Sequence, residues 1–187
     1  MTKVVVVYHS GYGHTGVQAK AVASGAGKVA GTEVTLLTTD EAQKWELLAD
    51  ADAIIFGSPT YMGSAAAQFK AFMEASSKLW FTRDWKDKVA AGFTTSASQS
   101  GDKLNTLIQL AGFAAQHGMI WVGQDLLPGN NSSTGSVNDL NRLGGFLGAM
   151  AQANSDQGPD VAPLQSDLLT AEHLGERVAT IAKRLRG

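Results

Sequence analysis

The chain has 187 residues, of which 44% are hydrophobic and 17% charged, a composition typical of a folded domain and not of a disordered segment. At this length we expect one domain spanning residues 1–187. Fifteen basic and seventeen acidic residues give a formal net charge of −2. The absence of any long run of Lys or Arg argues against a nucleic-acid partner and against a membrane surface.

The sequence contains no cysteine, which excludes disulfides, thiol redox chemistry and Cys-ligated zinc. Any redox function would therefore need a bound cofactor. Asp and Glu show no paired spacing that indicates hydrolytic catalysis, and we predict no metal site. The first residues lack the apolar core of a signal peptide, and no stretch approaches the roughly 20 apolar residues of a membrane span. We expect a cytoplasmic protein.

Five apolar runs predict the strands of a buried parallel sheet. The first, residues 4–8, is a continuous β-branched run of the kind that is buried on both faces. The others are residues 33–37, 52–57, 88–94 and 119–122. Helical patterns alternate with them at residues 15–29, 40–48, 65–79, 102–117 and 166–185. This alternation predicts an α/β fold, namely a flavodoxin-like doubly wound five-stranded parallel sheet of order 2-1-3-4-5 with helices on both faces.

One long segment, residues 124–164, shows no clean periodicity. It contains the run Pro128-Gly129-Asn130-Asn131-Ser132-Ser133 and the pair Gly144-Gly145. A connection of this length inside a compact domain is usually a lid or an interaction element, and we predict such a role here.

The first strand is followed by a glycine-rich loop, residues 10–16, that leads directly into a helix. Its glycines match the G-x-G-x-x-G pattern of dinucleotide sites, which would also require an acidic residue such as Asp40 at the end of the second strand. The hydroxyls of Ser10 and Thr15 favour a different ligand. Beside the N–H groups of a helix N-terminus they suit a terminal phosphate monoester such as that of FMN. The alternative is a glycine-rich turn without a ligand.

Two further polar loops, residues 57–63 and 94–101, follow the third and fourth strands. In an open α/β sheet, ligands bind beyond the carboxyl ends of the strands near the switch point, where all three loops would meet. Hydroxyls of Thr60, Thr95, Ser96 and Ser98 could bond a ribityl chain and a pyrimidine edge. Tyr61, Met62 and Trp80 could lie against a flavin ring.

Residues 3–15, 52–63, 79–80, 93–101, 114–119 and 172–185 resemble the flavodoxin-like NAD(P)H:quinone oxidoreductases of the WrbA type and the related NADPH-dependent FMN reductases. The resemblance implies FMN as cofactor, NAD(P)H as co-substrate, a quinone-like acceptor and a homo-dimer or homo-tetramer. The loops and the resemblance together give a predicted cofactor site formed by Ser10, Gly11, Tyr12, Gly13, His14, Thr15, Pro59, Thr60, Tyr61, Met62, Thr94, Thr95, Ser96, Ala97, Ser98, Gln99 and His117.

The resemblance also implies three catalytic residues. Tyr12 would lie near the nicotinamide nucleotide, and Trp80 would form a wall of the acceptor site that a neighbouring subunit completes. His117 would hydrogen-bond a quinone oxygen and supply a proton. From its position alone, His117 could equally be a cation that stabilises a helix C-terminus.

The chain departs from these quinone reductases at Tyr61, where they usually carry Arg, and its third loop is poorer in glycine. Residues 143–148 replace their Gly-Gly-x-Pro-Tyr-Gly element. We therefore keep two alternatives to an enzyme: a flavodoxin-type electron carrier and a non-catalytic FMN-binding interaction protein. A net charge of −2 fits poorly with the strongly acidic surface through which such carriers dock.

Overall fold

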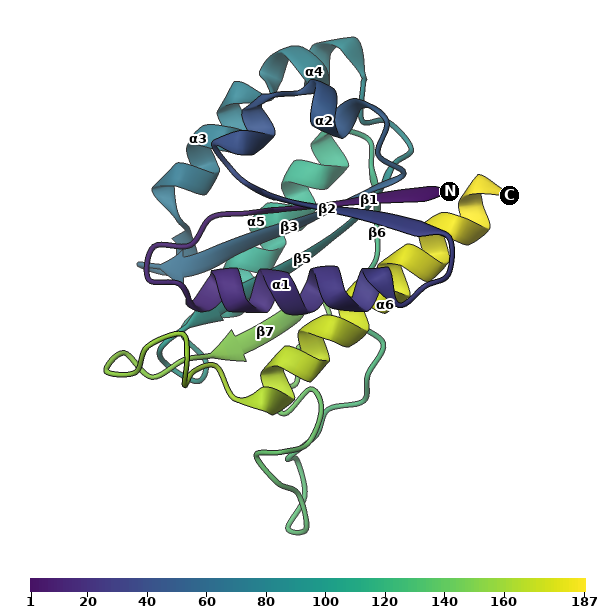
Figure 1. Ribbon diagram of the computed structural model, residues 1–187. Helices are drawn as coiled ribbons and strands as arrows, with labels where there is room; N and C mark the ends of the chain where they lie inside the picture. The colour runs from purple at the N-terminus through teal and green to yellow at the C-terminus, as the bar shows by residue number, and fades with distance from the viewer.

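A computed structural model describes all residues from 1 to 187, and a twisted sheet runs through its centre (Figure 1). The sheet has the order β2-β1-β3-β5-β6, with β4 paired to β3 and β7 paired to β5. The strands are β1 (Thr2–Tyr8), β2 (Thr32–Thr38), β3 (Ala53–Tyr61), β4 (Ser64–Ala65), β5 (Val89–Ser96), β6 (Ile120–Trp121) and β7 (Ala149–Gln152). All pairs except β3–β4 are parallel, so the predicted fold and strand order are confirmed.

Helices cover both faces of the sheet, with α1 and α6 on one face and α2 to α5 on the other (Figure 1). Their bounds are α1 (His14–Gly27), α2 (Glu46–Ala49), α3 (Ala67–Ala75), α4 (Ser77–Thr82), α5 (Lys103–Gln116) and α6 (Gln165–Arg186), with a 3-10 turn η1 (Glu41–Gln43) before α2. The single helix predicted at 65–79 is interrupted at Ser76, whose hydroxyl donates to the Met73 carbonyl. None of the helices is long and apolar enough to cross a membrane.

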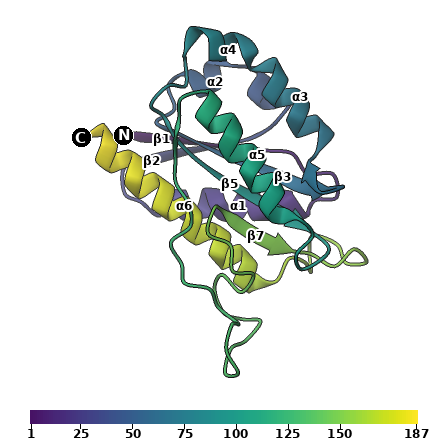
Figure 2. The same cartoon turned by 180° about the vertical axis from the view of Figure 1, so that it is seen from behind.

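Two short strands share the fifth position of the sheet. β6 pairs with the beginning of β5, at Val89 and Ala90, whereas β7 pairs with its end, from Phe93 to Ser96. Between them, residues 123–148 form a long loop that leaves the sheet, and the middle of this loop projects from the body of the molecule (Figure 2). Part of the segment 124–164, for which the sequence showed no periodicity, is therefore a strand. The loop after β7 reaches the carboxyl edge of the sheet, as do the loops after β1, β3 and β5.

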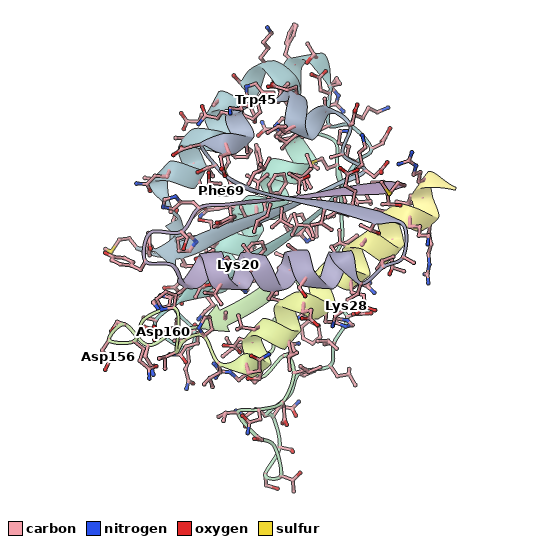
Figure 3. All side chains as sticks on the ribbon, in the orientation of Figure 1. Lys20, Lys28, Trp45, Phe69, Asp156 and Asp160 are labelled. Atoms are coloured by element: carbon pink, nitrogen blue, oxygen red, sulfur yellow. The ribbon has the colours of Figure 1, made fainter.

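Alternating side chains of the central strands supply two separate cores. Val4 and Val6 of β1 pack toward α1 and α6, and Val5 and Val7 pack toward α3 and α5. The second core is aromatic, and Phe69 lies in it between α3 and the sheet (Figure 3). Its rings meet at centroid distances between 5.3 and 6.3 Å, in tilted and edge-on contacts typical of aromatic clusters.

The helices α1 and α6 pack backbone against backbone. A side chain at Gly175 of α6 would collide with the Val22 carbonyl of α1, and one at Gly25 of α1 would collide with the backbone of Glu172. Only glycine permits this approach, which fixes the position of α1 and of the loop before it. The loop before α6 is fixed by the same contact.

Replacing Gly175 by Ala should lower the free energy of unfolding by roughly 1–3 kcal/mol, because the new methyl group forces α1 and α6 apart. Gly112→Ala is a matched control within a helix, since a methyl group there meets no atom within 4 Å. The control should gain about 0.5–1 kcal/mol from helix propensity. Urea unfolding of both variants tests this, and equal effects would contradict the proposed contact.

Candidate functional site

Four loops at the carboxyl edge of the sheet enclose a cavity of about 810 Å³, within the roughly 300–1,000 Å³ range of small-molecule sites. The loops follow β1, β3, β5 and β7. The residues that line the cavity are Ser10, Tyr12, His14, Thr15, Pro59, Thr60, Tyr61, Met62, Thr95, Ser96, Ala97, Ala153, Ser155, Gln157 and Gly158. Three of the loops are those predicted from the sequence.

The first loop, residues 10–16, is organised around the hydroxyl of Ser10. Its Oγ accepts hydrogen bonds from the backbone N–H groups of Gly13 and Gly16, each at 3.1 Å. Gly13 has a φ of +93°, which L side chains rarely adopt. This turn leaves the N–H groups of Tyr12, His14 and Thr15 without any acceptor in the chain. At the start of α1, these donors and the positive end of the helix dipole form a seat for an anion.

Thr15 adds a free hydroxyl to this seat. The residue is only 2% exposed and lines the cavity, yet no hydrogen bond within the chain involves its Oγ1. The cavity lining contains no Lys or Arg. An anion bound here would therefore be held by amide and hydroxyl dipoles and not by a cation.

Hydroxyls in the second and third loops serve mainly as internal supports. The Oγ1 of Thr60 lies 2.8 Å from the Oγ1 atoms of both Thr94 and Thr106. The hydroxyl of Thr95 donates to Oε1 of Gln18 on α1, at 2.6 Å. These buried bonds tie the ends of β3 and β5 to α5 and α1, which fixes the loops that follow the two strands.

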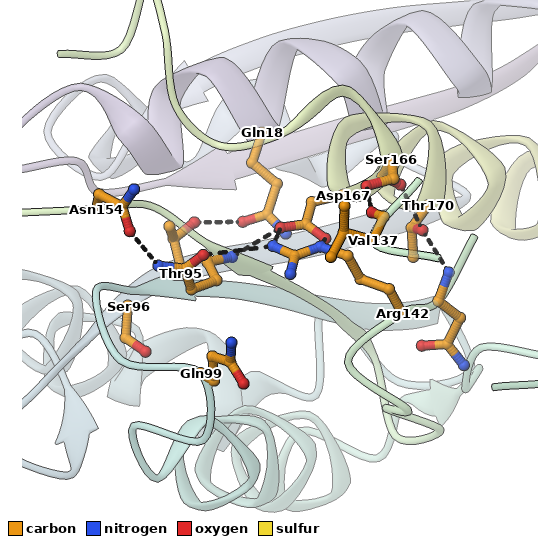
Figure 4. Close-up of polar contacts among 12 residues, drawn as sticks. Gln18, Thr95, Ser96, Gln99, Val137, Arg142, Asn154, Ser166, Asp167 and Thr170 are labelled. Carbon is orange, nitrogen blue, oxygen red and sulfur yellow. Dashed lines mark hydrogen bonds and ion pairs between the residues drawn. The ribbon is translucent and has the colours of Figure 1, made fainter. Parts of the chain in front are cut away.

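The fourth loop, residues 153–159, is held by a buried polar network (Figure 4). The guanidinium of Arg142 donates to both carboxylate oxygens of Asp167, at 2.8 and 2.7 Å, and both side chains are at most 4% exposed. The N–H of Gln152 donates to the same carboxylate at 2.9 Å. The amide of Gln152 then donates to the Ala97 carbonyl and to Oδ1 of Asn154, each at 2.8 Å. The network joins the third loop to the fourth.

Sequence analysis missed this fourth loop and its lining residues Ala153, Ser155, Gln157 and Gly158. A polar run rich in Gly and Pro after residues 149–152 was the available signal, because it repeats the composition of the other site loops. Nε2 of His14 lies 2.8 Å from the Gln157 carbonyl, so the His14 ring joins the first loop to the fourth.

Two tyrosines flank the mouth of the cavity. The rings of Tyr12 and Tyr61 meet edge to face, with centroids 6.1 Å apart and planes at 77°. Tyr12 is 77% exposed, and Met62 beside it is fully exposed. Burial, and to a smaller extent Tyr12, raise the pKa of Tyr61, so its phenol is protonated at neutral pH. This rim offers flat and apolar surfaces to a second ligand that enters from outside.

Several predicted residues do not line the cavity. Gly11, Gly13, Thr94, Ser98 and Gln99 belong to its loops or to the strand before them but lie outside the lining. Trp80 and His117 line a second cavity of about 660 Å³ that shares no residue with the first.

The position of α5 explains this separation of Trp80 and His117 from the other site residues. This helix starts at Lys103 beside the third loop and spans about 21 Å in its 14 residues. His117 follows its last residue and therefore lies near the opposite edge of the sheet.

The imidazole of His117 is almost entirely buried. Its Nε2 is 2.9 Å from the Ser76 hydroxyl, its Nδ1 has no partner, and its ring packs on Trp85 at 4.4 Å between centroids. Burial lowers the pKa of His117 to about 4, with a smaller contribution from Arg83. The ring is therefore neutral at physiological pH and can take part in hydrogen bonds without carrying a charge.

A doubly wound parallel sheet with an anion seat at the switch point and an aromatic rim defines the flavodoxin class of flavoprotein folds. Residues 13–132 match the family described as NADPH-dependent FMN reductase, and the chain belongs to that family. Membership confirms the resemblance found in the sequence and the prediction of FMN as the cofactor.

Individual relatives carry two kinds of name. The chain is 45% identical over 185 residues to the flavodoxin FldP of Pseudomonas aeruginosa (strain UCBPP-PA14), with 99% of both chains covered. It is 34% identical over 209 residues to an NAD(P)H dehydrogenase (quinone) of Archaeoglobus fulgidus, with 99% of this chain and 100% of that protein covered. The crystal structure of a flavodoxin, WrbA-like protein from Agrobacterium tumefaciens matches with a TM-score of 0.75 at 43% identity, covering 98% of this chain and 99% of the other.

The buried state of His117 makes stability depend on pH. Its pKa is about 4 in the folded chain and about 6.5 in the unfolded chain, so between these values the unfolded chain binds more protons. The free energy of unfolding should therefore fall as the pH drops from about 6.5 to about 4, by at most about 3 kcal/mol from this residue. Urea unfolding along this pH range should show a shallower fall for His117→Gln than for the wild type. Equal slopes would mean that His117 titrates normally.

Proposed function

We propose that the protein binds about one FMN per chain in the 810 Å³ cavity and passes two electrons from NAD(P)H to a quinone-like acceptor. The observation that carries this proposal is that the cavity combines free hydrogen-bond donors with an aromatic rim. Unpaired N–H donors and a free hydroxyl lie in the first loop, and the exposed side chains of Tyr12, Tyr61 and Met62 form an aromatic and apolar rim. This combination matches a ligand with a phosphate at one end and a flat ring system at the other.

The residues present fit FMN. The N–H groups of Tyr12, His14 and Thr15 and the hydroxyls of Ser10 and Thr15 would hold the phosphate, because nothing else in the chain uses these donors. The loops after β3 and β5 would hold the ribityl chain and the ring. FMN, when bound, supplies the redox chemistry, and the protein supplies orientation and exclusion of water.

The open side of the cavity supports a small acceptor. Tyr12 and Met62 are exposed beside it, so a flat ring can reach the cofactor there. Nicotinamide and quinone are both flat, and each must approach closely for fast transfer. They would therefore occupy the same position in turn, which is a ping-pong mechanism. Relatives named NAD(P)H dehydrogenase (quinone) align with almost the whole chain, and their names support NAD(P)H and a quinone as the two substrates.

One observation favours a different function. The relative that is 45% identical is named a flavodoxin, which supports an electron carrier that serves a protein partner instead of a small acceptor. The alternative of a non-catalytic FMN-binding interaction protein rests on the segment 124–164, of which only Ala153, Ser155, Gln157 and Gly158 line the cavity. The Tyr12 and Tyr61 rim suits both an enzyme and an electron carrier, so kinetics must separate these two functions.

Trp80 and His117 can contribute to an acceptor site only across a subunit contact, because they line a different cavity from the cofactor loops. A homo-dimer or homo-tetramer is therefore part of the proposal. In it, His117 would act as a neutral hydrogen-bonding group. A cytoplasmic location stays a prediction from the sequence.

Removing the hydroxyls of Ser10 and Thr15 together, as Ser10→Ala with Thr15→Val, should weaken FMN binding by roughly 2–4 kcal/mol, because two bonds to a charged group are lost. Thr32→Val is the control, since the Thr32 hydroxyl is also buried without a partner but lies at the start of β2, at the opposite edge of the sheet. Titration of the apoproteins with FMN measures the effect. An unchanged affinity in the double variant would place the phosphate elsewhere.

Initial rates with NADH or NADPH at several benzoquinone concentrations should give parallel double-reciprocal lines, because the two substrates use one position in turn. Intersecting lines would require two simultaneous sites and would refute the shared position. A protein that binds FMN yet oxidises neither nucleotide, with or without benzoquinone, would not be this enzyme and would leave the electron carrier and the non-catalytic FMN-binding protein.

A further inference from the structure

Lys103, the first residue of α5, is a buried cation without a carboxylate partner at contact distance. Its side chain is 1% exposed, and no ion pair involves it. Its Nζ instead donates to the backbone carbonyls of Ser98, Gln99 and Ser100, at 2.6, 2.9 and 3.4 Å. Burying a charge is costly unless hydrogen bonds compensate it. If this residue served only to fill space, an uncharged side chain could do so without the cost of burying a charge.

The three bonds determine the orientation of the third loop. In a trans peptide the C=O and N–H groups point in opposite directions. Because the carbonyls of Ser98, Gln99 and Ser100 turn toward Nζ, the N–H groups of the residues that follow each of them turn away from it. None of the N–H groups of residues 97–102 donates to an acceptor in the chain. The loop therefore presents free donors on the side away from Lys103. Ser96 and Ala97 at the start of this loop line the cavity, and residues 98–101 follow them outside the lining.

Charged groups around Lys103 come from two other elements. Asp167, at the start of α6, favours its ammonium form, and Arg142, in the long loop between β6 and β7, opposes it. Burial is the largest effect; together with the smaller effect of Arg142 it outweighs Asp167 and lowers the pKa of Lys103 to about 8. The ammonium is thus present at neutral pH and is lost in mildly alkaline solution.

We propose that Lys103 is a positioning residue of the FMN site, whose ammonium draws the carbonyls of residues 98–100 inward and turns the N–H groups of this loop toward the electron-rich edge of the flavin. This inference rests on the proposed function, because it assigns an FMN-binding role to the third loop. Loss of the proton from Lys103 removes one donor and the charge that hold the carbonyls. The loop then relaxes, and its N–H groups no longer converge.

The direction of the pH effect follows from linkage. If the ammonium form organises the binding loop, FMN binds that form more tightly, and binding raises the pKa of Lys103. Above pH 8 the apoprotein must take up a proton to bind FMN well. The affinity for FMN should therefore be constant near neutral pH and should fall as the pH rises through about 8.

Lys88 provides a matched control. Its Nζ also donates to backbone carbonyls, those of Ala49 and Ala51 at 2.7 and 2.6 Å, and burial also lowers its pKa. It precedes β5, at the opposite edge of the sheet from the cavity. Lys88→Met therefore removes a comparable cation and comparable bonds without touching the third loop.

The experiment titrates wild-type, Lys103→Met and Lys88→Met apoproteins with FMN between about pH 6.5 and 9.5, with circular dichroism as the check on folding. Wild type and Lys88→Met should weaken at least about threefold from pH 7 to 9. Lys103→Met should bind about tenfold or more weakly at pH 7 and should lack this step. Titration of FMN itself affects all three proteins alike.

Three results would overturn the inference: an affinity of Lys103→Met within about twofold of wild type, a wild-type pH profile in that variant, or an equal loss in Lys88→Met. If Lys103→Met does not fold, the wild-type profile decides, because a flat profile from pH 7 to 9 removes the role of the charge. A wild type that binds no FMN at all would instead refute the proposed function.

Discussion

The buried ion pair between Arg142 and Asp167 holds together the parts of the site that come from distant regions of the chain. Asp167 lies in the first turn of α6, Arg142 belongs to the long loop between β6 and β7, and the shared carboxylate also accepts the N–H of Gln152 at the end of β7. Removing one partner of such a pair typically costs about 3–5 kcal/mol, because the other charge stays buried. The pair therefore fixes where β7 ends and where the fourth loop enters the cavity.

Polar groups at the carboxyl edge divide into two sets with different tasks. Thr60, Thr94, Thr95 and Gln18 satisfy one another inside the protein, and unmade bonds among such buried groups would be costly. The donors left over, such as the Thr15 hydroxyl and the N–H groups of Tyr12, His14 and Thr15, belong to residues that line the cavity and are free to bind a ligand. The internal set makes the loops rigid, and this rigidity keeps the second set in position before a ligand arrives.

The sequence predicted the strands whose residues are β-branched and the loops rich in Gly, Ser and Thr, because both signals are local. It did not predict β7, since Ala149-Met150-Ala151-Gln152 has small residues that pack closely under α6 instead of a valine-rich pattern. Sequence analysis did not single out Lys103, because its burial and its bonds to the carbonyls of residues 98–100 depend on how the third loop folds. His117 precedes the fifth strand and so lies at the amino edge of the sheet, and only a second subunit could bring it to the loops.

A site without cations in its lining has consequences for how FMN is held. Dipoles act over short distances and depend on orientation, so each N–H group must be aimed by the loop that carries it. Glycine at position 13, the hydroxyl of Ser10 and the ammonium of Lys103 each aim such a group without touching the solvent side of the cavity. Lys103, the buried cation at the third loop, acts through backbone carbonyls and not through the ligand. Its charge can therefore orient the third loop while leaving the mouth of the cavity open to uncharged, flat substrates.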